Sequence, residues 1–153
     1  MQVKTLIIGA GAAGMMCAAH AGADVLIVDH AKTAGEKIRI SGGGRCNFTN
    51  LGLGVERFLS KNPRFALSAL KRFTALDFVA RVDAAGLAWH EKALGQLFCD
   101  GSAKEIVAML LNGVAEAGGQ VALNTSVQSV NAIETGYAIQ LSAAQGSRSV
   151  TAR

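Results

Sequence analysis

The chain has 153 residues, about the length of one domain, and half of them are hydrophobic. Its apolar N-terminal stretch from Thr5 to Ala19 is fifteen residues long and interrupted by glycines, which is too short to span a bilayer. The formal net charge is +4, and the three cysteines form no C-x-x-C pair. We therefore expect a cytoplasmic protein with no membrane partner and no metal site.

The first predicted elements form a strand-helix-strand unit. Residues 3–8 and 24–28 are apolar and typical of short buried parallel strands, and residues 12–21 have the length of a crossover helix. The glycine-rich run GAGAAG of residues 9–14 lies between the first strand and the helix, an order typical of dinucleotide binding. We expect Gly9 to permit a tight turn, Gly11 to let the backbone approach a pyrophosphate, and Gly14 to let the helix pack closely on the strand.

Asp29 ends the second predicted strand, twenty residues after Gly9. A carboxylate at this place accepts hydrogen bonds from ribose hydroxyls and repels a 2′-phosphate, which favours FAD or NAD over NADP. His30 follows directly and lies close to the predicted ribose site.

Residues 31–53 are rich in Gly, Ser, Asn and Thr and are expected to form a long irregular segment, which in compact domains is usually functional. Three adjacent glycines, Gly42 to Gly44, allow successive backbone amides to form an anion nest, with Lys37 and Arg45 adding positive charge. The P-loop pattern is not present. Residues 32–81 carry ten Lys or Arg against three acidic residues. Because no recognised module or aromatic stacking platform accompanies this charge, nucleic acid is not an expected partner.

The rest of the chain predicts further helices and strands. A helical pattern begins at Asn62-Pro63 and continues to about Ala85, with Thr74 as a point of division. Residues 87–91 and 96–99 are typical of a strand pair, Ser102 of a helix cap, and residues 121–124, 127–133 and 137–141 of strands, with another strand before the end of the chain. His90-Glu91 begins a zincin pattern, but Leu94 replaces the second histidine, so a metalloprotease is rejected.

These elements predict an α/β fold over residues 1–153: a Rossmann-like FAD/NAD(P)-binding domain with a mostly parallel sheet, crossover helices and a small antiparallel β-meander. The glycine run of residues 9–14, together with Lys37-Ile-Arg-Ile-Ser-Gly-Gly-Gly-Arg-Cys-Asn-Phe-Thr-Asn50, resembles the BaiN/YhiN-type bacterial flavoproteins. These are known as NAD(P)/FAD-dependent or aminoacetone-oxidase-like FAD-binding oxidoreductases.

The resemblance implies that the protein binds FAD. The adenosine would lie on the glycine run of residues 9–14, called the first motif, and the backbone of Val127 would lie near the adenine. The Ser41–Asn47 loop would lie along the pyrophosphate and extend toward the flavin. The expected cofactor-binding residues are Gly9, Gly11, Ala12, Ala13, Gly14, Asp29, His30, Lys37, Ser41, Gly42, Gly43, Gly44, Arg45, Cys46, Asn47 and Val127. Such proteins continue through an inserted domain to a second glycine-rich segment, which residues 1–153 do not contain. Gln96 also stands where the family often has arginine.

The predicted function is the FAD-binding portion of a flavin-dependent oxidoreductase that transfers hydride or electrons to an unidentified small molecule, with NAD(P)H considered as the electron donor. Two alternatives stay open: an NAD-linked dehydrogenase fragment and a non-catalytic nucleotide-binding module. No catalytic acid or base is assigned, and the oligomeric state is left open. Cys46 is a candidate nucleophile because Arg45 would lower its pKa, although a packing role is favoured.

Overall fold

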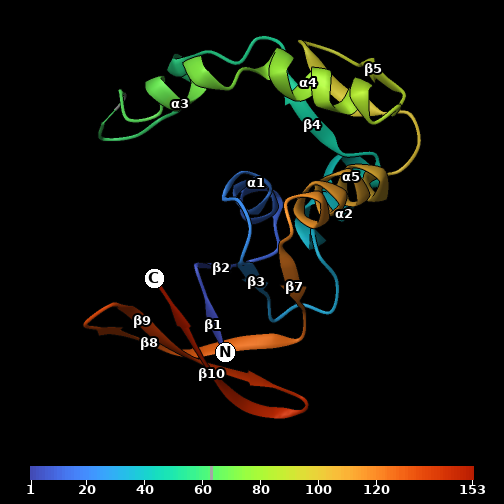
Figure 1. Cartoon of the computed structure of the whole chain (residues 1–153). Helices are drawn as coiled ribbons and strands as arrows, with labels where there is room; N and C mark the ends of the chain where they lie inside the picture. The colour runs from blue at the N-terminus through green and yellow to red at the C-terminus, as the bar shows by residue number, and fades with distance from the viewer. Residues whose placement is uncertain (63) are drawn as a thin grey trace. The chain divides into compact units, whose positions relative to one another are not determined.

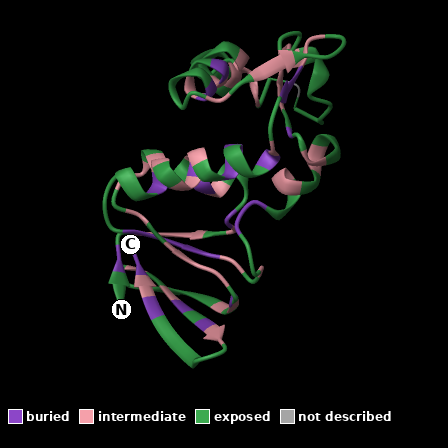
Figure 2. Cartoon of the chain, turned by 90° about the vertical axis from the view of Figure 1, so that its right-hand side faces the viewer, coloured by how far each residue is buried: buried purple, intermediate pink, exposed green. Residues whose placement is uncertain are grey.

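The computed structural model describes residues 1–62 and 64–153, which form two compact units (Figure 1). The first unit comprises residues 1–38 and 107–153, and the second comprises residues 39–106. Buried residues lie mainly in the strands and along one side of the longer helices (Figure 2). Within the described ranges, no helix has both the length and the apolar character that crossing a membrane requires.

The first unit contains a parallel sheet of three strands in the order β2-β3-β7. β3 (Val25–Val28) lies between β2 (Thr5–Ile8) and β7 (Gln120–Ala122), and all four of its residues are buried. A strand covered on both faces requires apolar side chains at every position, which explains its uninterrupted apolar run. α1 (Ala12–His20) connects β2 to β3 and buries Met15 and Ala18. The predicted Rossmann-like α/β unit is thereby confirmed, with the helix ending one residue earlier than expected.

The predicted antiparallel meander is also present in the first unit. It consists of β8 (Thr125–Ile133), β9 (Gly136–Ala143) and β10 (Gly146–Ala152), and β1 (Gln2–Val3) pairs with β10 in parallel. The meander shares a buried apolar cluster with β3, formed by Val3, Leu26, Val28, Ile139, Leu141, Val150 and Ala152. Burial of these side chains is the main favourable contribution to holding the meander and the parallel strand together.

The single strand expected over residues 3–8 is divided at Lys4. The Lys4 amide donates to both the carbonyl oxygen of Asp24, at 3.1 Å, and its side-chain Oδ2, at 3.0 Å. Because that amide is bonded to the turn before β3, Val3 pairs with Ala152 in one sheet and Thr5 pairs with Val25 in the other. Residues 2–3 and 5–8 thus belong to different sheets, and the contact that separates them comes from Asp24, twenty residues after Lys4.

The second unit is built on an antiparallel sheet in the order β4-β6-β5. β5 (Trp89–Glu91) and β6 (Gln96–Cys99) confirm the predicted strand pair. β4 (Asn47–Asn50) was not predicted as a strand. α4 (Ala75–Ala84) packs on this sheet through Phe78, whose ring centroid lies 6.0 Å from that of Phe48 on β4. Within the sheet, the Phe48 ring centroid lies 6.3 Å from that of Trp89 on β5.

The helical pattern expected after residue 62 is two helices, divided at Thr74 as predicted. α3 (Leu67–Arg72) precedes α4, and a short 3-10 turn η2 (Val55–Arg57) precedes both. Pro63, half of the predicted start signal, lies outside the described residues, and α3 begins at Leu67. Thr74 caps α4: its Oγ1 accepts from the Asp77 amide, and the Asp77 carboxylate accepts from the Thr74 amide at 2.7 Å.

The segment 31–53, expected to be irregular, contains more regular structure than predicted. α2 (Glu36–Ile40) and the 3-10 turn η1 (Ser41–Gly44) precede β4 within it. α5 (Ala103–Glu116) begins directly after Ser102, as expected. Ser102 Oγ accepts from the Lys104 amide at 3.2 Å, whereas the Glu105 amide, the partner in the capping box expected from the sequence, donates to the Ser102 carbonyl oxygen at 2.9 Å. It ends before Gly118, which has φ +77°.

Candidate functional site

The turn between β2 and α1 needs glycine at two positions for separate reasons. Gly9 has φ +107°, a conformation that side-chain-bearing residues rarely adopt, and its amide donates to the Val28 carbonyl at 2.8 Å. Gly14 has no such torsion, but a Cβ at this position would overlap the carbonyl oxygen of Gly9 and lie 3.3 Å from Ile7 Cγ2. The packing reason predicted for Gly14 and the turn predicted for Gly9 agree with this geometry.

Gly11 stands at the N-cap of α1 with φ −86° and ψ −173°, which any residue can adopt. A Cβ at Gly11 would meet no atom within 4 Å, so the space beside the backbone is open. In this fully described part of the chain, no side chain caps the helix and its first turn has no acidic residue. The amides at this end of the helix are therefore available to an anion, and the open space fits the approach of a pyrophosphate.

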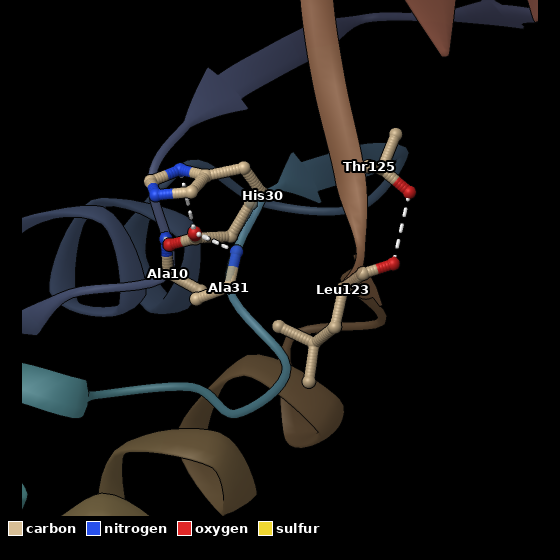
Figure 3. Close-up of polar contacts among 6 residues, drawn as sticks. Ala10, His30, Ala31, Leu123 and Thr125 are labelled. Carbon is tan, nitrogen blue, oxygen red and sulfur yellow. Dashed lines mark hydrogen bonds and ion pairs between the residues drawn. The ribbon is translucent and has the colours of Figure 1, made fainter. Parts of the chain in front are cut away.

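Asp29 connects the glycine turn to the end of β3 through the amides of Ala10 and Ala31, which Figure 3 labels. Its Oδ2 accepts from the Ala10 amide at 2.6 Å and its Oδ1 from the Ala31 amide at 2.8 Å. Burial by itself would raise the pKa of Asp29, but the hydrogen bonds from Ala31 and Ala10, with His30 nearby, lower the pKa below its usual value. The carboxylate is thus held ionised, and two of its roughly four lone-pair sites stay available to ribose hydroxyls.

The other predicted residues of the first unit are spread around this turn. His30 is 83% exposed, and its Nδ1 lies 3.4 Å from Asp29 Oδ1. Lys37 is exposed on α2. Val127 is half-buried against the apolar cluster of the meander, next to a register shift in the pairing of β8 with β9. The ribose, phosphate and adenine contacts expected of these residues stay predictions.

The segment 37–50, the second motif of the family resemblance, lies in the second unit apart from Lys37 and Ile38, and its glycines form a left-handed turn. Gly42, Gly43 and Gly44 have φ of +56°, +68° and +87°. A Cβ at Gly42 would lie 2.6 Å from Cε1 of the Phe98 ring, whereas one at Gly43 would meet nothing within 4 Å. The turn is closed by the Cys46 amide, which donates to the Ser41 carbonyl at 3.1 Å. Arg45 and Asn47 are exposed beside it, and the expected contacts of Ser41 to Asn47 with a cofactor stay predictions.

Cys46 is not an activated nucleophile in this structure. It is buried at φ +55°, and burial raises the pKa of its thiol despite a hydrogen bond with the Ser41 side chain. The sequence-based suggestion that Arg45 would lower this pKa is therefore wrong, because desolvation of the thiolate is the larger effect. The packing role favoured from the sequence agrees with this burial.

Sequence reasoning missed the backbone partners of Asp29 and a side-chain pair in the second unit. His90 Nδ1 lies 2.6 Å from Asp100 Oδ1, and the His90 ring stacks on Phe98, the same ring that contacts Gly42. The sequence indicated only His90, as the first residue of a zincin pattern that Leu94 interrupts, and it gave no sign of the pairing with Asp100. The described residues contain no cluster of three or more side chains able to hold a metal ion.

Comparison with known proteins places these features in a family. The model of the HI0933-like protein Rossmann domain matches residues 3–152. The chain also has the fold of a solved flavoprotein, the open conformation of a flavocytochrome c3 fumarate reductase: the TM-score is 0.61 at 21% identity, and the match covers 99% of this chain and 32% of that one.

Two curated relatives share one name, ribosomal RNA dihydrouridine synthase. The protein of Escherichia coli (strain K12) is 51% identical over 143 residues, which cover 92% of this chain and 36% of the relative. The protein of Haemophilus influenzae is 46% identical over 134 residues, covering 86% of this chain and 33% of the relative. The chain therefore spans about a third of the length of the curated relatives it matches.

These relatives overturn one expectation drawn from the sequence. Nucleic acid was rejected as a partner because neither a recognised module nor an aromatic stacking platform was found with the basic stretch, yet both relatives are named for an activity on ribosomal RNA. The physical error was to require a familiar module before taking the concentrated positive charge as a sign of a polyanionic partner.

Proposed function

This chain belongs to the family of HI0933-like proteins, and from that membership we propose that residues 1–153 are the FAD-binding domain of an enzyme that reduces uridine to dihydrouridine in ribosomal RNA. The membership confirms the resemblance to BaiN/YhiN-type flavoproteins. The observation that carries the proposed activity is the sequence identity to the Escherichia coli synthase across nine-tenths of this chain.

The geometry of the first unit supports FAD as the cofactor. The open space at Gly11 and the uncapped amides of α1 suit the pyrophosphate, and the Asp29 carboxylate, already fixed by the Ala10 and Ala31 amides, suits the ribose. When bound, the flavin supplies the two-electron chemistry. The residues of the glycine turn bind and orient the cofactor, because they present backbone amides rather than reactive side chains.

The proposed reaction saturates the C5–C6 double bond of uracil. A hydride adds to one of these carbons and a proton to the other, so the base gains two hydrogen atoms, and a reduced nicotinamide, NAD(P)H, provides the two electrons. A uracil stacked in folded RNA does not expose its ring face to an enzyme-bound cofactor, so the target nucleotide must leave its stack. The enzyme therefore needs contacts that hold the nucleotides flanking the target.

Purification of the whole protein tests both parts of this proposal. We expect a yellow protein with a flavin spectrum that, with NADPH, converts ribosomal RNA from a strain lacking the gene into RNA in which one uridine has gained two hydrogen atoms by mass spectrometry. RNA from the complemented strain, already modified, is the matched control. A flavoprotein that oxidises NADPH but leaves every uridine unchanged would refute the RNA activity and retain the cofactor assignment.

A further inference from the structure

The positive charge of the chain is concentrated in its second unit. Residues 39–106 contain ten Lys or Arg and six Asp or Glu, whereas the first unit contains five of each, so the net charge of +4 belongs entirely to the second unit. Within that unit the sequence from 57 to 73 has five cationic residues and no acidic one. Such a segment attracts a polyanion.

The described part of this segment, residues 57–62 and 64–73, is called here the basic arm. Its cationic and aromatic residues are Arg57, Phe58, Lys61, Arg64, Phe65, Lys71, Arg72 and Phe73, all of which are exposed. Arg57 has a weak partner, with its Nε 3.8 Å from Glu56 Oε1. Among the described residues, no carboxylate pairs with the other four cations, which are therefore available to phosphates.

Aromatic rings alternate with these charges along the basic arm. Phe65 is 83% exposed, Phe58 and Phe73 are each 38% exposed, and Leu59 is 95% exposed. No described residue between Asn47 and Phe78 is buried, so these rings contribute to no core of the second unit. Exposed aromatic rings beside cations are the combination of side chains that proteins use to bind single-stranded nucleic acid.

The basic arm is joined to a fixed support. α3 ends at Arg72, and Thr74 begins α4, whose Phe78 packs against Phe48 of the sheet. Phe73 lies at the junction, with the guanidinium of Arg81 on α4 5.9 Å from its ring centroid. Lys71 and Arg72, the last two cations of the arm, are therefore directly joined to a packed helix of the unit.

We propose that the basic arm binds an unpaired stretch of the RNA substrate, with Phe65 stacking on a base and Lys61, Arg64, Lys71 and Arg72 contacting phosphates. Aromatic rings suit the bases of a single strand and cations suit its backbone, a combination that neither a duplex nor a purely anionic surface requires. This inference rests on the proposed function, because it assigns contacts to the RNA that such an enzyme modifies.

The test measures affinity of the flavin-loaded whole protein for a fluorescent single-stranded RNA oligonucleotide. We expect Phe65→Ala and Phe65→Leu each to weaken binding about tenfold, since a stacked base contributes roughly 1–3 kcal/mol, while Phe65→Trp retains it. Lys61→Gln with Arg64→Gln should also weaken binding. The matched control, Lys4→Gln with Arg148→Gln in the first unit, removes the same charge and should bind as the wild type does.

Leucine at position 65 separates RNA stacking from an apolar contact with another part of the protein. If the rest of the polypeptide covers Phe65, Phe65→Leu keeps RNA affinity and Phe65→Ala lowers the melting temperature, and the inference is overturned. If the wild type binds anionic lipid vesicles, the arm variants lose that binding, and all of them bind the RNA equally well, the inference is overturned as well. Normal RNA affinity in all arm variants of an enzyme that still forms dihydrouridine rejects the arm alone, whereas a wild type that neither binds nor modifies RNA rejects the proposed function.

Discussion

The glycines of the first motif differ in what a side chain at each position would meet. At Gly14 a methyl group would overlap the Gly9 carbonyl oxygen, which is backbone and has little freedom to move. At Gly11 the torsions are ordinary and the surrounding space is open. Glycine at position 14 is therefore required by the fold, and glycine at position 11 leaves room for a ligand.

This difference predicts opposite phenotypes for two substitutions. Gly14→Ala should lower the free energy of unfolding by at least about 1–3 kcal/mol, the usual effect of overpacking, because α1 must move away from β2. Gly11→Val should lower that free energy less and abolish flavin retention, because its side chain would fill the place proposed for the pyrophosphate. Urea unfolding and the flavin absorbance of the purified protein measure the two effects. Full flavin content in Gly11→Val would contradict the binding site proposed for the first motif.

The lowered pKa of Asp29 predicts that the protein loses stability in acid. Its pKa is lowered in the folded state by the Ala31 and Ala10 amides against the opposing effect of burial, so its contribution is present above its unfolded pKa of about 4 and is lost as the pH falls through the folded value. In Asp29→Asn the contribution, on the order of 1.5–3 kcal/mol for a bond to a charged group, should be missing at pH 6. Unfolding curves from pH 6 to pH 3 should therefore converge for the two proteins, and parallel curves would argue against this role.

The cysteines differ in reactivity because only one is accessible. Cys17 is exposed, while Cys46 and Cys99 are buried. Burial, with smaller contributions from Cys46, Glu105 and Asp100, raises the pKa of Cys99 to about 11. Iodoacetamide at pH 7.5 should therefore alkylate Cys17 in the native protein and the other two only after unfolding, as peptide mass spectrometry would show. Rapid native alkylation of Cys46 would restore it as a candidate nucleophile.

At the scale of elements, local patterns were sufficient for some parts of the fold and not for others. β3 and α5 were predictable because an apolar run and a capped amphipathic stretch carry their own signals. β4 was not, because Asn-Phe-Thr-Asn has little apolar character and forms a strand only by pairing with β6, about fifty residues later. The same applies to the site: the glycines and Asp29 are visible in the sequence, whereas the Ala10 amide reaches the Asp29 carboxylate only because β2 and β3 pair side by side.

The capping box of α4 is a local signal with a measurable effect. Thr74→Ala removes the hydroxyl that accepts from the Asp77 amide and should reduce the free energy of unfolding by about 1 kcal/mol. Ser68→Ala, which removes an exposed hydroxyl within α3, is the matched control and should have a much smaller effect. Equal stability of Thr74→Ala and the wild type would show that side-chain packing, by Phe78 and the buried Val79 and Val82, fixes this helix without the capping box.

At the scale of the whole molecule, the two units differ in charge and in the ligand proposed for each. The first unit has no net charge and presents backbone amides, which suits a cofactor bound by directed hydrogen bonds. The second unit carries the whole net positive charge of the chain, which suits a long polyanion. The two proposed ligands should therefore respond differently to ionic strength.

Raising KCl from 50 to 200 mM should separate them. If Lys61, Arg64, Lys71 and Arg72 each contact one phosphate, the affinity for single-stranded RNA follows salt with a log–log slope of about −2.8 and falls about fifty-fold over this range. Flavin occupancy should stay constant, because the proposed site places the flavin phosphates on amides at the end of α1 and not on mobile cations. Replacing all four cations with glutamine should flatten the slope for RNA. An unchanged slope in that variant would place the phosphate contacts elsewhere, even if the enzyme modifies RNA normally.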